Sequence, residues 1–270
     1  MRRWPGGRLL RHHRPEHRAR GRRERGAVGA VVADGVAGAG AGRGRSGGGG
    51  AGYCVGALGW RVARGGAAGL LWLLRWGGAT ASLAGLLVVG ALALVTRGMH
   101  LDGLADTADG LGSYGPPERA REIMKSGGAG PFGVAAIVFA VGVQAFSFAA
   151  LADERRWFAV ALAVTAGRVA VVLACRRGIE SAPDAGFGAL VAGTQRATTG
   201  TLWAVFAAAV AFFAVPEHRW AGPVAVLAGL AVTVVIVRHC VRRFGGLSGD
   251  VLGAVIEIAV AITAFGCSLA

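Results

Sequence analysis

Long apolar runs, separated by short polar segments, occupy the chain from Gly77 onward. A helix that crosses the hydrocarbon core of a bilayer needs about 20 apolar residues. Lipid offers no hydrogen-bond partners, so a spanning segment must satisfy its own backbone groups, as a helix does. We therefore predict an all-α, polytopic membrane helix bundle with about six to seven transmembrane helices. The runs cover residues 78–96, 129–152, 157–175, 200–215, 220–237 and 251–269, and GLLWLL before Arg75 is part of a further span or a re-entrant segment.

The positive charge of the chain is concentrated before this apolar part. The net charge is +14, but the first 50 residues contain twelve arginines and three acidic residues, which leaves only +5 for the remainder. That remainder is ordinary for a membrane protein with basic cytoplasmic loops. The four cysteines form no CxxC pair, so neither a zinc site nor a disulfide framework is indicated. We predict a lipid bilayer as a partner and no nucleic acid.

The sequence divides into two parts. Residues 1–65 are rich in Arg, Gly and Ala and have no helical or strand periodicity, so we predict that this segment is disordered or is not the true N-terminus. We predict that residues 66–270 form the membrane-embedded domain.

The distribution of basic residues predicts the orientation of this domain. Ten Lys and Arg residues lie in the segments 97–128, 176–199 and 238–250, whereas the alternate segments 153–156 and 216–219 hold three. The positive-inside rule places the three basic segments in the cytoplasm. The N-terminus then lies outside, unless another segment crosses between about residues 50 and 76.

Three aspartates stand close together in the stretch HLDGLADTADGLGSY. Asp102, Asp106 and Asp109 follow an i, i+4, i+7 spacing, so their directions on a helix differ by at most about 60°. Aligned carboxylates repel one another and provide hard oxygen ligands, which favours Mg²⁺ or Mn²⁺ bridging a substrate phosphate. The alternative is that they only cap and solvate a helix end.

Other polar residues occur within or beside the apolar runs. Glu257 and Arg168 lie mid-span, where charge is costly, so they are either functional or joined in a structural salt bridge. Gln144 is expected to form a hydrogen bond between helices. The segment RRFGGLSGDV, from Arg242 to Val251, either holds a phosphate or is simply a positive loop.

Six blocks in the same order resemble the cobalamin synthases, or adenosylcobinamide-GDP ribazoletransferases, which are bacterial membrane enzymes. The blocks are HLDGLADTADG at 100–110, ERAREIMK at 118–125, GPFG at 130–133, GRVAVVLACRR at 167–177, DAGFGALVAGT at 184–194 and GGLSGDVLGAVIEI at 245–258. The resemblance extends from about residue 67 to the end. The first and last blocks are long enough to be specific.

The resemblance implies transfer of the adenosylcobinamide phosphoryl group from adenosylcobinamide-GDP to α-ribazole or its 5′-phosphate, with release of GMP. It implies Mg²⁺ as cofactor, location in the bacterial cytoplasmic (inner) membrane, and a homo-oligomer or a complex with other corrinoid-assembly enzymes. The metal ligands are expected to be Asp102, Asp106 and Asp109, the catalytic candidates are His100, Asp106 and Glu257, and the substrate or phosphate contacts are Lys125, Arg168, Arg242, Arg243 and Asp250. The proton acceptor is left open between a carboxylate and His100, which is otherwise a helix-start residue without a catalytic part.

Two departures from the family pattern stand out. Ser126, Gly127 and Gly128 occupy the place of a usual Asp-Ser-Arg run, which removes an expected metal or phosphate contact. Residues 1–65 lack the family's usual opening and first span. A frame error or misplaced start upstream of Leu70 would account for this second departure.

Two other functions compete with this interpretation. The segment from Asp106 to Gly110 begins like the motif of CDP-alcohol phosphotransferases, but its continuation GLGSYGPPERA differs from that motif. An inactive membrane scaffold or transport component is the other alternative.

Overall fold

The computed structural model describes residues 65–183 and 186–270. The predictions for residues 1–64 lie outside this part of the chain. The described residues form helices and no β-strand, which confirms the all-α prediction. A helix over 65–76 comes first. It is followed by α3 (Ala81–Val95), α4 (Met99–Gly112), α5 (Pro117–Met124), α6 (Pro131–Asp153), α7 (Trp157–Ala174), α8 (Gly188–Val191), α9 (Ala197–Val210), the 3₁₀ turn η1 (Ala211–Phe213), α10 (Ala221–Phe244) and α11 (Gly249–Ser268).

Each of the six predicted spans corresponds to a helix. Within the described ranges, α6, α7, α10 and α11 are long and apolar enough to cross a membrane, and the bent pair α3 and α4 makes a fifth candidate. The apolar segment Ala197–Phe213, which joins α9 and η1, is shorter. The main difference from the prediction is that α10 continues to Phe244, beyond the apolar run. Its last turn carries Arg242 and Arg243, whose charges are favourable at a helix C-terminus.

Local sequence explains where several helices begin. The side chains of Thr80 and Ser248 accept hydrogen bonds from the first turns of α3 and α11, as N-cap residues do. Proline stands at the first position of α5 and α6, where its missing N–H has no cost.

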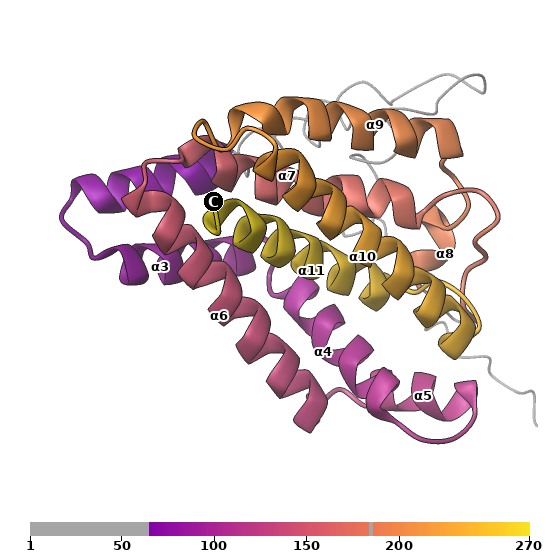
Figure 1. Cartoon of the computed structure of the whole chain (residues 1–270). Helices are drawn as coiled ribbons and strands as arrows, with labels where there is room; N and C mark the ends of the chain where they lie inside the picture. Colours follow the sequence, from indigo (N-terminus) through magenta and orange to yellow (C-terminus); the bar gives the residue numbers. More distant parts are fainter. Residues whose placement is uncertain (1–64, 184–185) are drawn as a thin grey trace, which may run out of the picture.

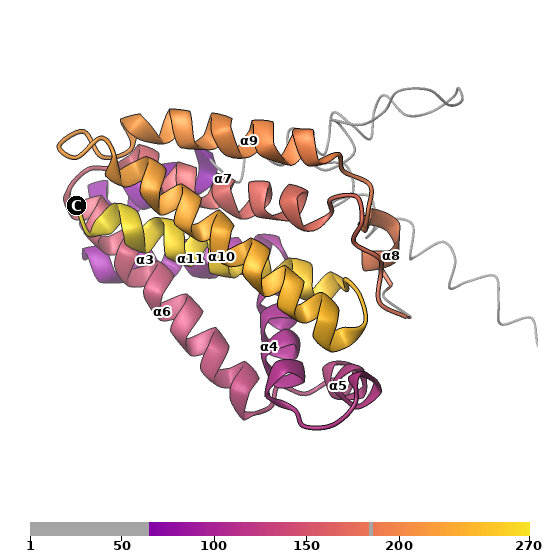
Figure 2. The same cartoon turned by 45° about the vertical axis from the view of Figure 1, so that its right-hand side comes forward.

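Helix α11 lies at the centre of the bundle and packs against α4, α6, α7 and α10. Helix α9 lies at the edge, against α7 and α10, in both views (Figures 1 and 2). Helix α4 diverges from the end of α3 and runs between α6 and α11 toward α5 (Figure 1). The aspartate-rich stretch is therefore a helix inside the bundle, and not an external loop.

A sharp bend of 91° separates α3 from α4. It is formed by Arg97 and Gly98, which have φ values of 54° and 75°. Left-handed backbone of this kind ends a helix, and glycine adopts it without strain. The Gly98 N–H donates to the carbonyl oxygen of Ala93 over 2.8 Å, which closes the end of α3. The bend places the start of α4 beside the middle of α11.

The three basic segments meet at one end of the bundle. Arg243 at the end of α10 donates to the Ser113 carbonyl oxygen over 2.9 Å, and the Ala182 N–H donates to the Leu247 carbonyl oxygen over 3.0 Å. At the opposite end, Arg75 pairs with Asp153 over 2.9 Å. The predicted alternation of the segments is thus confirmed, whereas the side of the membrane that this end faces stays a prediction from the charge count.

Candidate active site

Helices α4 and α11 approach each other closely and run antiparallel. A Cβ atom on Gly103 would lie 2.6 Å from the carbonyl oxygen of Asp250, and one on Gly253 would lie 3.1 Å from the His100 Cα. Small residues at facing positions let two membrane helices approach to backbone contact. The close packing brings residues from the first and last sequence blocks into one region.

The aspartate face of α4 meets the start of α11. Asp102 is exposed and Asp106 is half-buried. The negative charges of Asp102 and Asp250 act on Asp106, and that of Asp109 acts on it as well. No described residue donates a side-chain or backbone hydrogen bond to the Asp102 or Asp106 carboxylate. We call Asp102, Asp106 and Asp250 the acidic cluster, and its mutual repulsion favours a bound cation.

The donor set of the acidic cluster fits magnesium shared with a substrate. Within 65–183 and 186–270, no three His, Cys, Asp or Glu side chains are placed to hold one metal ion. Mg²⁺ usually keeps several waters and is bound by one or two carboxylates together with substrate phosphates. Asp102 and Asp106 provide two such carboxylates, so the cluster suits that open arrangement and not a closed protein cage.

Asp109, the third predicted metal ligand, has different neighbours. Its carboxylate is buried and accepts hydrogen bonds from the N–H groups of Gly130 over 2.6 Å and Gly133 over 2.9 Å. These groups lie at the N-terminus of α6. The structure therefore does not join all three aspartates in one ligand group, and the role of Asp109 as a metal ligand stays a prediction.

A small cavity adjoins the acidic cluster. It has a volume of about 50 Å³, and its lining includes Arg121, Lys125, Ser248 and Asp250. The positive charge of Lys125 acts on the Asp250 carboxylate. Cationic side chains beside an acidic cluster are suited to contact phosphate oxygens next to a metal ion.

The predicted phosphate contacts at the end of α10 do not enter this cavity. Arg242 is exposed in the last turn of the helix. Arg243 donates to the carbonyl oxygen and hydroxyl of Ser113, so it joins α10 to the end of α4. Arg121, which is not among the predicted site residues, donates to the Phe244 carbonyl oxygen over 2.8 Å. No local pattern marks Arg121, because its acceptor lies 123 residues away.

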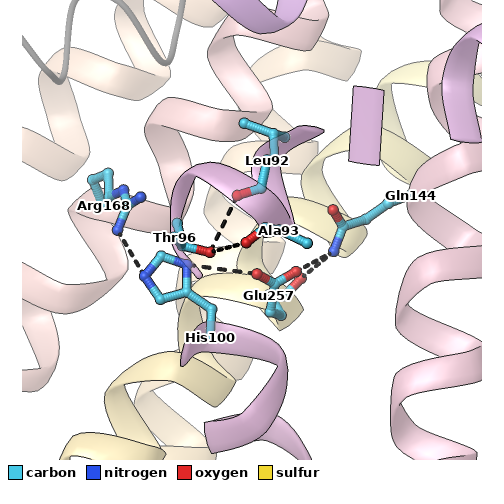
Figure 3. Close-up of polar contacts among 7 residues, drawn as sticks. All are labelled: Leu92, Ala93, Thr96, His100, Gln144, Arg168 and Glu257. Carbon is cyan, nitrogen blue, oxygen red and sulfur yellow. Dashed lines mark hydrogen bonds and ion pairs between the residues drawn. The ribbon is translucent and has the colours of Figure 1, made fainter. Parts of the chain in front are cut away.

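A second polar group lies deeper, at the start of α4. Figure 3 shows the His100 ring between Arg168 of α7 and Glu257 of α11, with Gln144 of α6 on the far side of Glu257. His100 Nε2 lies 3.3 Å from Arg168 Nη1, and its Nδ1 lies 3.6 Å from Glu257 Oε1. Gln144 Nε2 donates to Glu257 Oε2 over 2.7 Å, which confirms the predicted interhelical bond. We call these four residues the inner polar cluster.

The neighbours of His100 determine which of its two ring nitrogens carries the proton in the neutral form. A guanidinium can only donate hydrogen bonds, so a neutral His100 accepts at Nε2 and carries its proton on Nδ1, toward Glu257. His100 thus links the two charges that the sequence placed mid-span, in place of a direct salt bridge. A cavity of about 50 Å³ adjoins the cluster and is large enough for water.

Comparison with known proteins identifies the family of the chain. The family model for cobalamin-5-phosphate synthase matches residues 48–268. The chain belongs to the cobalamin-5-phosphate synthase family. The match begins upstream of residue 66, where the sequence predicts the membrane domain to start, and it includes the whole of the acidic and inner polar clusters.

Three relatives of the chain have the same name. An adenosylcobinamide-GDP ribazoletransferase of Corynebacterium efficiens is 39% identical over 206 residues, covering 74% of this chain and 75% of the relative. Proteins of the same name from Frankia casuarinae and a Nocardioides species are 39% and 41% identical, covering 65% and 66% of this chain and 67% and 69% of their own lengths. No solved structure matches the chain.

The departure from the family pattern at residues 126–128 lies outside both clusters. Ser126, Gly127 and Gly128 are exposed in the turn between α5 and α6. The neighbouring Lys125 still faces the charge of Asp250. The missing side chains therefore change the rim of the site and leave the acidic cluster in place.

Proposed function

We propose that the chain transfers the adenosylcobinamide phosphoryl group from adenosylcobinamide-GDP to α-ribazole or its 5′-phosphate, with release of GMP. The proposal rests on membership of the family and on the names of the relatives. The single structural observation that carries it is the backbone contact between α4 at Gly103 and α11 at Asp250, which brings the Asp250 charge within reach of Asp102 and Asp106. This arrangement concentrates negative charge where a metal-bound diphosphate would sit.

In this proposal, Asp102 and Asp106 would hold Mg²⁺ together with the diphosphate of the substrate. When bound, the ion stabilises the negative charge that develops on the non-bridging and leaving oxygens. Lys125 contacts a phosphate oxygen beside the cluster. Asp250 lies at the same place and orients the reacting groups together with Asp102.

A carboxylate of the acidic cluster is the better candidate to accept the proton of the ribazole hydroxyl. His100 is less suited, because Arg168 occupies the only nitrogen at which a neutral ring accepts. Glu257 is held by Gln144 and faces His100, so its proposed part is to orient the start of α4. Arg168 contributes to the same arrangement.

The proposed location is the cytoplasmic membrane, with the end that carries the acidic cluster on the cytoplasmic side. Support comes from the ten basic residues in the three segments that meet there. Association with a second copy or with other corrinoid-assembly enzymes stays a prediction from the family resemblance.

Replacing Asp106 with asparagine tests the reaction and the metal together. Membranes containing wild type or Asp106→Asn are incubated with adenosylcobinamide-GDP and α-ribazole over a range of Mg²⁺ concentrations, and the corrinoid product is measured. We expect the variant to need about tenfold more Mg²⁺ for half-maximal rate, because one ligand oxygen is lost. Glu122→Gln, an exposed change on α5, is the matched control and should behave as wild type.

Two results would contradict the proposal. An unchanged Mg²⁺ requirement in Asp106→Asn would mean that the acidic cluster does not bind the metal. No product from well-expressed wild type would favour a scaffold or transport component over a transferase.

A further inference from the structure

The Asp109 carboxylate is enclosed by the first turn of α6. One oxygen accepts from the Gly130 N–H over 2.6 Å, and the other accepts from the Gly133 N–H over 2.9 Å. Asp109 belongs to α4, so the two bonds join α4 to α6 through residues that are 21 and 24 positions apart in the chain. The first N–H groups of a helix have no partner within it, and a carboxylate satisfies them well.

The two glycines of the GPFG block lie so close to this carboxylate that neither position has room for a side chain. A Cβ atom on Gly130 would lie 2.6 Å from Asp109 Oδ1, and one on Gly133 would collide with Asp109 Oδ2. Any larger residue at either position would displace the carboxylate. Gly142, further along the same helix, has nothing within 4 Å of the place where its Cβ would stand. The spacing of Gly130 and Gly133 thus has a specific partner.

The position of the Asp109 carboxylate at the N-terminus of α6 also compensates its negative charge. The N-terminus of a helix carries a partial positive charge, and α6 is 23 residues long. Asp109 is buried, whereas Asp102 on the same face is exposed. A buried carboxylate that both accepts two N–H bonds and faces a helix N-terminus needs no metal ion to be stable.

We infer that Asp109 is a positioning residue that anchors the N-terminus of α6 to α4, and is not a ligand of the metal. The anchor holds α4 between α6 and α11, so that Asp102 and Asp106 face Asp250. In this arrangement Asp102 and Asp106 are the metal ligands, and Asp109 is the anchor. The metal part of this inference rests on the proposed function, whereas the anchor itself does not.

Amide hydrogen exchange tests the anchor without any assay of activity. The full chain in lipid nanodiscs is compared as wild type, Asp109→Asn and Gly133→Ala, and exchange is followed in the segment 130–134. Asparagine keeps the shape but presents an N–H₂ group to one of the two donors. We expect exchange to be about tenfold to 100-fold faster in both variants, because charge-assisted bonds to the first turn are lost. Gly142→Ala is the matched control and should exchange as wild type.

The dependence of the rate on Mg²⁺ separates an anchor from a ligand. For Asp109→Asn and Gly133→Ala, we expect a lower maximal rate with the Mg²⁺ concentration for half-maximal rate within twofold of wild type. The two changes should also be non-additive in the double variant, because both remove the same contact. If either single variant does not fold, Gly130→Ala replaces it in the same comparison.

Two outcomes would overturn the inference. One is unchanged exchange at 130–134 in the Asp109 and glycine variants. The other is an Asp109→Asn variant whose Mg²⁺ requirement rises tenfold while that of Gly133→Ala stays within twofold of wild type. A wild type without transferase activity would refute the proposed function but would leave the exchange comparison intact.

Discussion

Replacing Glu257 with leucine is expected to lower the free energy of unfolding by about 3 kcal/mol, the lower end of the range for a buried ion pair, because it removes the carboxylate that offsets the charge of the partly buried Arg168 through His100. The Glu257 carboxylate attracts the Arg168 guanidinium, faces His100 Nδ1 and accepts from Gln144. Leucine provides none of these interactions. Thermal and denaturant unfolding of the purified protein in detergent micelles measures the loss.

The double variant Arg168→Leu/Glu257→Leu is the matched comparison. Removing both charges together is often neutral for stability, although His100 and Gln144 still lose the contacts that they make with Arg168 and Glu257. We expect it to recover part of the stability that Glu257→Leu loses. Equal destabilisation of the single and double variants would show that the two charges are not coupled. Transfer activity, measured in parallel, shows whether the cluster is also needed for the reaction.

Replacing Gly103 with valine is expected to reduce the transfer rate roughly 100-fold or more, since a shift of about 1 Å in a reacting group costs about that much. The new Cβ would stand 2.6 Å from the Asp250 carbonyl oxygen, where ordinary contacts are 3.4–4 Å. Helix α4 must therefore move away from α11, which separates Asp102 and Asp106 from Asp250. The rate in membranes and the melting temperature in detergent are both measured.

Gly90→Val is the control for this prediction. Gly90 lies on α3 with no atom within 4 Å of the place of its Cβ, so the same substitution starts from open space there. We expect it to retain most of the activity. If Gly103→Val were as active as Gly90→Val, the close approach of α4 and α11 would not be what places the acidic cluster.

The helices of this protein could be predicted from the sequence because their signals are local. Apolar runs of sufficient length, prolines such as Pro131 at the first helical position and the glycine at Gly98 all act within a few residues. The extension of α10 to Phe244 was missed, since hydropathy marks where the hydrocarbon ends and not where the helix ends.

The partners of the site residues could be predicted only in part. Gln144 and Glu257 were correctly selected as polar groups within spans, because charge and amide groups are conspicuous in an apolar run. That Gln144 binds Glu257, and that His100 lies between Glu257 and Arg168, depends on how four helices pack. The glycine spacing in GPFG was the one local signal for the Asp109 contact, but it does not name its partner.

The sequence by itself determined that this is a helical membrane protein with three carboxylates on one face of a helix, because helical periodicity turns spacing into direction. Only the tertiary structure decided what each carboxylate meets. Asp106 lies within reach of the charges of Asp102, Asp250 and Asp109, whereas the Asp109 carboxylate accepts hydrogen bonds from the N-terminus of α6. The physical reason is that direction on a helix follows from 100° per residue, but the neighbour in that direction is set by close packing of helices far apart in the chain.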